Sequence, residues 1–130
     1  MFQRHFPDGH WQAIETGSTG LGIPDLNGVI SGVELWIELK LATAIAVDVR
    51  PEQVAWIERR VRAGGRAFIA VRCKCSAGAR RVARDELHLY NGSSGRRLKE
   101  HGLNARPLGA WAGGPTKWDW KAIRDFLISQ

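Results

Sequence analysis

Two acidic residues and one lysine in the first third of the chain have the types and spacing that divalent-metal chemistry needs. Asp25 follows Pro24, and Glu38 and Lys40 come thirteen and fifteen residues after it. Two carboxylates can hold a hard divalent cation, which prefers oxygen ligands. A cation held there activates water and offsets charge at a phosphorus atom, while a nearby lysine serves the water or the phosphate. These residue types therefore suit hydrolysis of a phosphodiester bond.

The elements that must position these residues can be predicted from the alternation of apolar side chains. Leucine or isoleucine occupies positions 35, 37, 39 and 41. Alternate side chains of a strand share a face, so we predict a strand over 35–42 that is buried on one face and carries Glu38 and Lys40 on the other. A second strand is predicted over 23–30, and Ser31-Gly32 predicts the tight turn between the two.

A hairpin centred on this turn pairs Ile30 with Val33 and places Asp25 directly opposite Glu38. Directly opposed residues have Cβ atoms about 4.5–5.5 Å apart. Two carboxylates at that separation repel, which raises the pKa of one of them, and a bound cation removes the conflict. We therefore predict that the two carboxylates converge, an arrangement that a slip of one residue would destroy.

Two other interpretations fit the same residues. A Glu-x-Lys pair on an exposed strand face is common, and Pro-Asp alone indicates a turn. The chain is then either a basic nucleic-acid-binding domain without catalysis or a domain of another kind whose Glu-x-Lys pair is ordinary surface. Metal-dependent cleavage distinguishes the catalytic interpretation from both, and salt-sensitive DNA binding distinguishes the two alternatives from each other.

Length and charge favour one domain with a polyanionic partner. The chain has 130 residues, of which 44% are hydrophobic, and we predict a single domain over 1–130. Nineteen basic residues against thirteen acidic ones give a net charge of +6, which favours a nucleic acid as partner. The sequence has no apolar run long enough to span a membrane and no signal-peptide core at its start, so we expect a cytoplasmic protein without a membrane partner.

Basic and aromatic side chains provide candidate contacts to nucleic acid. The segment from Cys75 to Arg84 contains no acidic residue, and we predict that Arg80, Arg81 and Arg84 contact the phosphate backbone. Trp36 shares a predicted face with the Glu-x-Lys pair, so it is the best candidate among six tryptophans for stacking on a base. Packing in the core is the alternative for all six.

The rest of the chain has the pattern of helices alternating with strands. Pro51 suits the first turn of a helix that Gly64-Gly65 ends, and its apolar stripe is Val54, Ile57 and Val61. A third strand is predicted over 66–72, and it is expected to be central because every residue between Arg66 and Arg72 is apolar. The preceding helix is then a crossover connection. A fourth strand is predicted over 86–90, a loop over 91–95, and a last helix capped by Thr116.

Gly22 to Asp25, Trp36 to Lys40 and Gln53 occur in an order that resembles the PD-(D/E)XK nuclease superfamily. The resemblance covers residues 10–72 and is greatest to the small phage, VRR-NUC-like and Holliday-junction-resolvase-like branch. It implies an α/β restriction-endonuclease-like core with a central mixed β-sheet flanked by helices. It also implies an Mg²⁺- or Mn²⁺-dependent endonuclease that cuts DNA, with selectivity for junctions or flaps.

The resemblance also implies roles for individual residues. Asp25 and Glu38 would be metal ligands together with the backbone carbonyl of Leu39. Lys40 would position or activate the water, and Gln53 would brace the lysine or the water from its helix.

Many members of the superfamily use an earlier glutamate, and Glu15 is the only acid between Asp8 and Asp25. Glu15 is therefore a further candidate ligand, with an ordinary surface acid as the alternative. A resolvase-like role would favour a symmetric homodimer that cuts two strands, and a phage origin would place the protein in the bacterial host cell.

Overall fold

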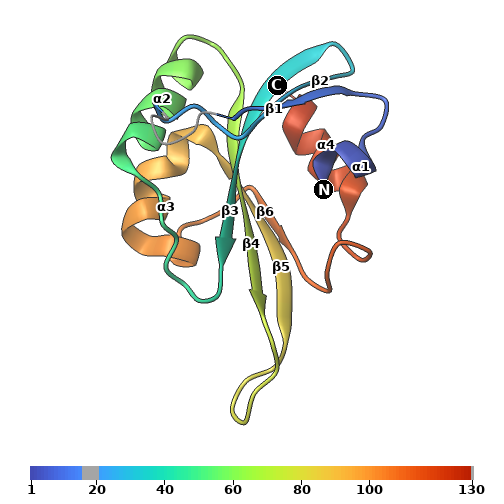
Figure 1. The fold of residues 1–130 in the computed structure, drawn as a ribbon, viewed down its shortest axis with the longest axis vertical. Coiled ribbons are helices and arrows are strands. Elements are labelled where there is room, and N and C mark those ends of the chain that lie inside the picture. Colours follow the sequence, from blue (N-terminus) through green and yellow to red (C-terminus); the bar gives the residue numbers. More distant parts are fainter. Residues whose placement is uncertain (16–20, 130) are drawn as a thin grey trace.

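One six-stranded sheet organises the protein in the computed structural model, which describes residues 1–15 and 21–129 (Figure 1). The strands lie side by side in chain order. β3 and β4 are parallel, and every other neighbouring pair is antiparallel. The sheet is therefore mixed, as predicted. The strands are β1 (His10–Ala13), β2 (Leu26–Ile30), β3 (Val33–Ala42), β4 (Ala67–Cys75), β5 (Arg84–Asn91) and β6 (Gly109–Trp111).

Helices cover both faces of this sheet. α2 (Pro51–Arg62) and α3 (Gly95–His101) lie on one face, and α1 (Phe2–His5) and α4 (Trp120–Ile128) lie on the other (Figure 1). Each face buries its own apolar cluster. This arrangement confirms the predicted α/β class, with a central mixed sheet flanked by helices. No helix in the described part of the chain is long and apolar enough to cross a membrane.

The β2–β3 hairpin has the predicted turn and register. Ser31 and Gly32 both have positive φ angles, 51° and 77°, the conformation that a two-residue hairpin turn requires. Ile30 pairs with Val33, and the ladder continues to the last pair, Leu26 with Ile37. β2 begins at Leu26 rather than at residue 23, since the proline just before Asp25 has no N–H to donate to a ladder.

The β3–α2–β4 unit also forms as predicted. Pro51 occupies the first turn of α2, and Gly64, with φ of 95°, follows its end. Val54 and Ile57 are buried. β4 then returns parallel to β3 and is buried on both faces from Ala67 to Val71, which is typical of a central strand.

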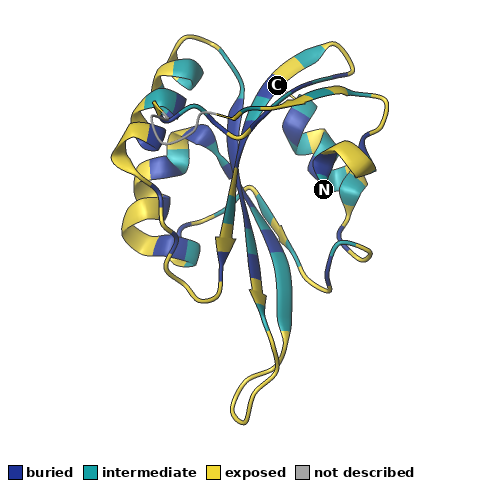
Figure 2. Ribbon diagram, in the orientation of Figure 1, coloured by how far each residue is buried: buried dark blue, intermediate teal, exposed yellow. Residues whose placement is uncertain are grey.

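Burial along β3 differs from the prediction. Leu35 and Ile37 are fully buried, but Leu39 and Leu41 are 40% and 72% exposed. They extend past the cluster that α1 and α4 cover, and β3 is coloured as exposed near its arrowhead (Figure 2). The opposite face was predicted to be open, yet Glu38 on that face is buried beneath α2.

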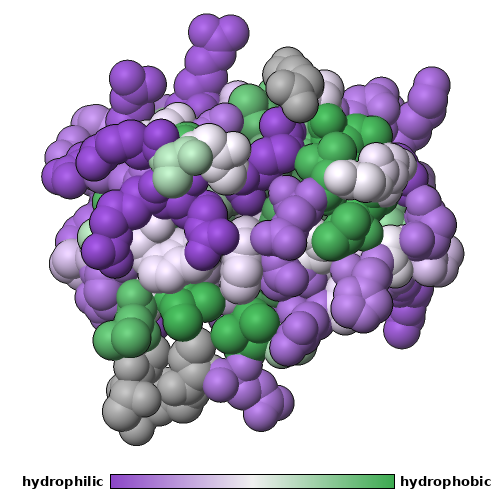
Figure 3. All heavy atoms as spheres, turned by 90° about the horizontal axis from the view of Figure 1, so that it is seen from above, coloured by the Kyte–Doolittle hydropathy of each residue, from purple (hydrophilic) through white to green (hydrophobic). Residues whose placement is uncertain are grey.

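The C-terminal third corrects two local predictions. Residues 91–95 are not a loop: the Asn91 side chain accepts a hydrogen bond from the Ser93 N–H at 2.9 Å and starts a 3₁₀ turn that leads into α3. Asp119 rather than Thr116 caps α4, because its carboxylate accepts from the Ala122 N–H at 3.0 Å. Seen from above, hydrophilic side chains cover most of the surface, with smaller hydrophobic groups between them (Figure 3).

Candidate active site

β3 carries its Glu-x-Lys segment beyond the point where β2 stops pairing with it. The last pair of the β2–β3 ladder is Leu26 with Ile37. Two residues later, the Leu39 N–H donates to Asp25 Oδ2 at 2.9 Å, so a side chain takes the place of a main-chain partner. The N–H and C=O of one strand residue point to the same side. The Leu39 carbonyl therefore also points toward the edge at which Asp25 lies.

Gln53 joins the acid and the lysine of β3 to the first turn of α2. Its Nε2 donates to Glu38 Oε2. Its Oε1 accepts from Lys40 Nζ at 2.7 Å and from the Arg50 backbone N–H at 3.0 Å. Glu38 and Gln53 are the two buried polar or charged residues among those described, with Glu38 only 1% exposed. One amide thus fixes the carboxyl and the ammonium relative to each other.

The two acids influence each other electrostatically. The pKa of Glu38 is raised from its ordinary 4.5 to about 8, first by burial and then by the hydrogen bond and charge of Asp25, while Lys40 acts in the opposite direction. A second negative charge is therefore unfavourable beside Asp25 in the metal-free protein. A divalent cation between the two carboxylates would remove this conflict, and hard oxygen donors are the ligands that Mg²⁺ prefers.

Gly22 brings the Asp25 loop against α2. Its φ is 82°, and a Cβ at this position would overlap the Glu52 carbonyl in the first turn of α2. Only glycine tolerates both the conformation and the close approach. The same turn of α2 therefore places Gln53 against β3 and contacts the loop that carries Asp25.

Glu15 is not joined to these groups by any described contact. It is exposed, and the Ile14 N–H donates to the Asp25 carbonyl at 2.8 Å, so Ile14 rather than Glu15 lies opposite Asp25. Within residues 1–15 and 21–129, no three His, Cys, Asp or Glu side chains form a metal-binding group. The oxygen donors that the structure brings together are the carboxylates of Asp25 and Glu38 and the Leu39 carbonyl, and this set fits a hard divalent cation.

Trp36 packs against α2 beside the candidate site. Its ring lies 5.2 Å from that of Trp56, and the Arg60 guanidinium lies over both rings, 5.3 Å and 4.6 Å from their centroids. Gln53, Trp56 and Arg60 share one face of α2. The sequence resemblance singled out Gln53, but it gave Trp56 and Arg60 no role at the site, because the helix was read from its apolar stripe. Contact of Trp36 with a substrate stays a prediction.

The three predicted phosphate-binding arginines have different surroundings. Arg84 forms an ion pair with Glu86 at 2.8 Å, so part of its charge is already compensated. Arg80 and Arg81 are exposed at the end of the β4–β5 hairpin, which projects from the body of the protein (Figure 1).

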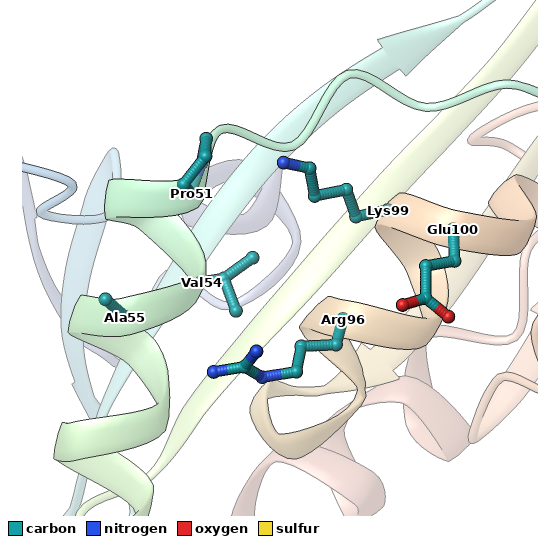
Figure 4. A pocket seen from close by; sticks show the side chains of 6 residues that line it. All are labelled: Pro51, Val54, Ala55, Arg96, Lys99 and Glu100. Carbon is teal, nitrogen blue, oxygen red and sulfur yellow. The ribbon is translucent and has the colours of Figure 1, made fainter.

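A separate cavity of about 390 Å³ lies between α2 and α3 (Figure 4). Pro51, Val54 and Ala55 line it from α2, and Arg96, Lys99 and Glu100 line it from α3. Its described lining contains none of the residues of the candidate site. Arg96 is held by Glu58 at 2.8 Å.

Comparison with solved structures identifies a protein of the same fold. It is Hjc, a Holliday junction resolvase from the archaeal hyperthermophile Archaeoglobus fulgidus. The TM-score is 0.51, and the match covers 92% of this chain and 82% of that chain at 12% sequence identity. No family model and no curated protein matches the sequence. At this identity the likeness shows that the two proteins share a fold.

Proposed function

We propose that this protein is a divalent-metal-dependent DNA endonuclease of the PD-(D/E)XK type, related to the phage and VRR-NUC-like branch and selective for branched DNA. The observation that carries this proposal is the connected unit formed by Asp25, Leu39, Glu38, Gln53 and Lys40. The shared fold with a Holliday junction resolvase supports the same activity class. A homodimer would present one site to each of two strands.

The carboxylates of Asp25 and Glu38 and the carbonyl of Leu39 would hold Mg²⁺ or Mn²⁺. The bound cation supplies an activated water and offsets negative charge at the phosphate. Gln53 keeps the Lys40 ammonium next to Glu38, where the lysine can orient the water or neutralise a phosphate oxygen. The burial of Glu38 limits competing solvent around its carboxyl.

The alternative of a basic DNA-binding domain without catalysis accounts for the net charge but not for the buried acid. Burying a carboxyl beside a second carboxyl costs free energy unless a partner compensates it. A domain that only binds phosphate gains nothing from that arrangement, since neither acid attracts phosphate. The pair is therefore better explained by a cation that binds there.

The direct test uses labelled four-way junction, flap, duplex and single-stranded DNA, each incubated with the protein in Mg²⁺ and in EDTA. We expect cleavage in Mg²⁺ and none in EDTA, with the junction or the flap cut faster than the plain duplex. Equal binding in both conditions without cleavage of any substrate would contradict the nuclease proposal and support the non-catalytic alternative.

A further inference from the structure

β4 and β5 continue past the other strands as a two-stranded ribbon. The last pair between β3 and β4 is Ala42 with Cys73, so the ribbon, residues 74–84, has no third strand beside it in the described structure. Cys75 pairs with Arg84, and a further bridge joins Gly78 to Arg81 near the tip. The ribbon extends well beyond the helices that flank the sheet (Figure 1).

The ribbon carries positive charge and an exposed apolar side chain at its end. It contains no acidic residue, and its cations are Lys74, Arg80, Arg81 and Arg84. Arg84 is paired with Glu86 at the base, which leaves the strongest uncompensated charge at the tip. Val82, next to the two tip arginines, is 82% exposed. The tip therefore offers both cationic groups, which suit phosphates and base edges, and an apolar side chain, which suits thymine methyl groups.

We propose that the ribbon enters the major groove of a duplex arm of the DNA substrate. The major groove is about 12 Å wide and admits a two-stranded β-ribbon. Arg80 and Arg81 would contact phosphates or guanine edges, and Val82 would contact thymine methyl groups. Single-stranded DNA has no groove, so the ribbon selects double-stranded arms. This contact with the groove needs no catalysis. Only the distance between the contact and a cleaved bond rests on the proposed function.

The distance from the candidate site to the tip sets the length of arm that is needed. Val71 on β4 lies beside Lys40 on β3, and Gly78 is seven residues further along. At about 3.3 Å per residue, the tip lies up to about 23 Å beyond the level of Lys40. Duplex DNA rises about 3.4 Å per base pair, so this span corresponds to about seven base pairs. Because this span is an upper limit, an arm of about seven base pairs is long enough to reach the tip, and contacts with the tip are lost as the arm becomes shorter.

The test measures binding in EDTA to junctions whose arms are shorter and longer than this length. Wild-type affinity should rise once the arms exceed about seven base pairs, and Arg80→Gln/Arg81→Gln should remove that rise. Loss of two phosphate contacts would also lower the log–log salt slope by about 1.8 on duplex DNA. Arg4→Gln/Lys121→Gln removes the same charge from exposed positions on α1 and α4, and it should keep the rise.

A second experiment tests whether the ribbon contacts the major groove. It uses DNA methylated at guanine N7, an atom that lies in the major groove. Methylation about seven base pairs from the branch should weaken wild-type binding and leave the ribbon variant unaffected. An equal loss of affinity by the ribbon variant for single strands and duplex, or no dependence on arm length, would overturn the proposal. If wild type shows the arm-length dependence but no cleavage in Mg²⁺, the ribbon proposal stands and the nuclease proposal fails. Cleavage without arm-length dependence would support the nuclease proposal and overturn the ribbon proposal.

Discussion

At the scale of single residues, Gln53 determines how the acid and the lysine of β3 are arranged. Its amide uses both ends at once, with Nε2 on Glu38 and Oε1 shared between Lys40 and the Arg50 N–H. A carboxylate in its place would keep the acceptor and lose the donor. An amide is therefore the side chain that satisfies a carboxyl and an ammonium from one position.

Replacing Gln53 should cost stability as well as activity. Gln53→Ala leaves the buried Glu38 carboxyl without its donor, and we expect a loss of about 1–3 kcal/mol in the free energy of unfolding, measured by urea titration. Glu52→Ala is the matched control, because Glu52 is exposed on the same turn and such changes usually stay within about 0.5 kcal/mol. Equal losses in the two variants would show that the amide has no special role.

The raised pKa of Glu38 predicts how stability depends on pH without metal. The carboxyl titrates near 4.5 in the unfolded chain and near 8 in the folded protein. Between these values the folded protein holds a proton that the unfolded chain has lost, so this contribution to stability is complete below about pH 4.5 and is lost as the pH rises through 8. We expect the Tm in EDTA to fall over this window.

Glu38→Gln isolates this effect because its side chain stays neutral at every pH. The fall in Tm should be much smaller in this variant, whereas Glu34→Gln, an exposed change on the same strand, should keep it. Parallel Tm curves for wild type and Glu38→Gln would show that the pKa of Glu38 is not raised.

At the scale of elements, the first turn of α2 positions both halves of the candidate site. Gln53 reaches down to β3 from this turn, and Gly22 seats the Asp25 loop against the Glu52 carbonyl. The hairpin register and the helix start were both predictable, because turn glycines and an N-terminal proline are local signals. The close contact between Gly22 and α2 was not predictable, because it depends on how a loop and a helix far apart in the sequence approach each other.

A pair of glycine substitutions distinguishes the effect of the close contact between Gly22 and α2 from the effect of a positive φ angle alone. Gly22 and Gly32 both have positive φ, 82° and 77°, but a Cβ at Gly32 meets nothing within 4 Å. Gly32→Ala should cost about 1–2 kcal/mol from the left-handed conformation. Gly22→Ala carries the same strain plus an overlap with α2, so it should destabilise more and also reduce cleavage. Equal free energies of unfolding for the two variants would contradict the claim that Gly22 is needed for the close approach of the Asp25 loop to α2.

At the scale of the whole molecule, the sequence predicted the half that carries the candidate site better than the rest. The β2–β3 hairpin, α2 and β4 follow from strict alternation, a helical stripe and clear breakers. α3 was missed because it is short and buries a single leucine, Leu98, and β6 because it has three residues. The exposure of Leu39 and Leu41 depends on where α1 and α4 stop covering the sheet, which alternation along one strand does not reveal.

The most direct measurement of the central claim is single-turnover cleavage of junction DNA in Mg²⁺ by Asp25→Asn and by Asp48→Asn. Both changes remove one negative charge, but Asp48 is exposed in the segment between β3 and α2. We predict that Asp25→Asn lowers the cleavage rate at least about a hundredfold, because losing a ligand weakens binding of the cation that offsets negative charge in the transition state. The variant should bind DNA in EDTA at least as tightly as wild type. Asp48→Asn should cleave like wild type. Cleavage by Asp25→Asn at the wild-type rate, or an equal loss of cleavage rate in both variants, would contradict the assignment of the active site.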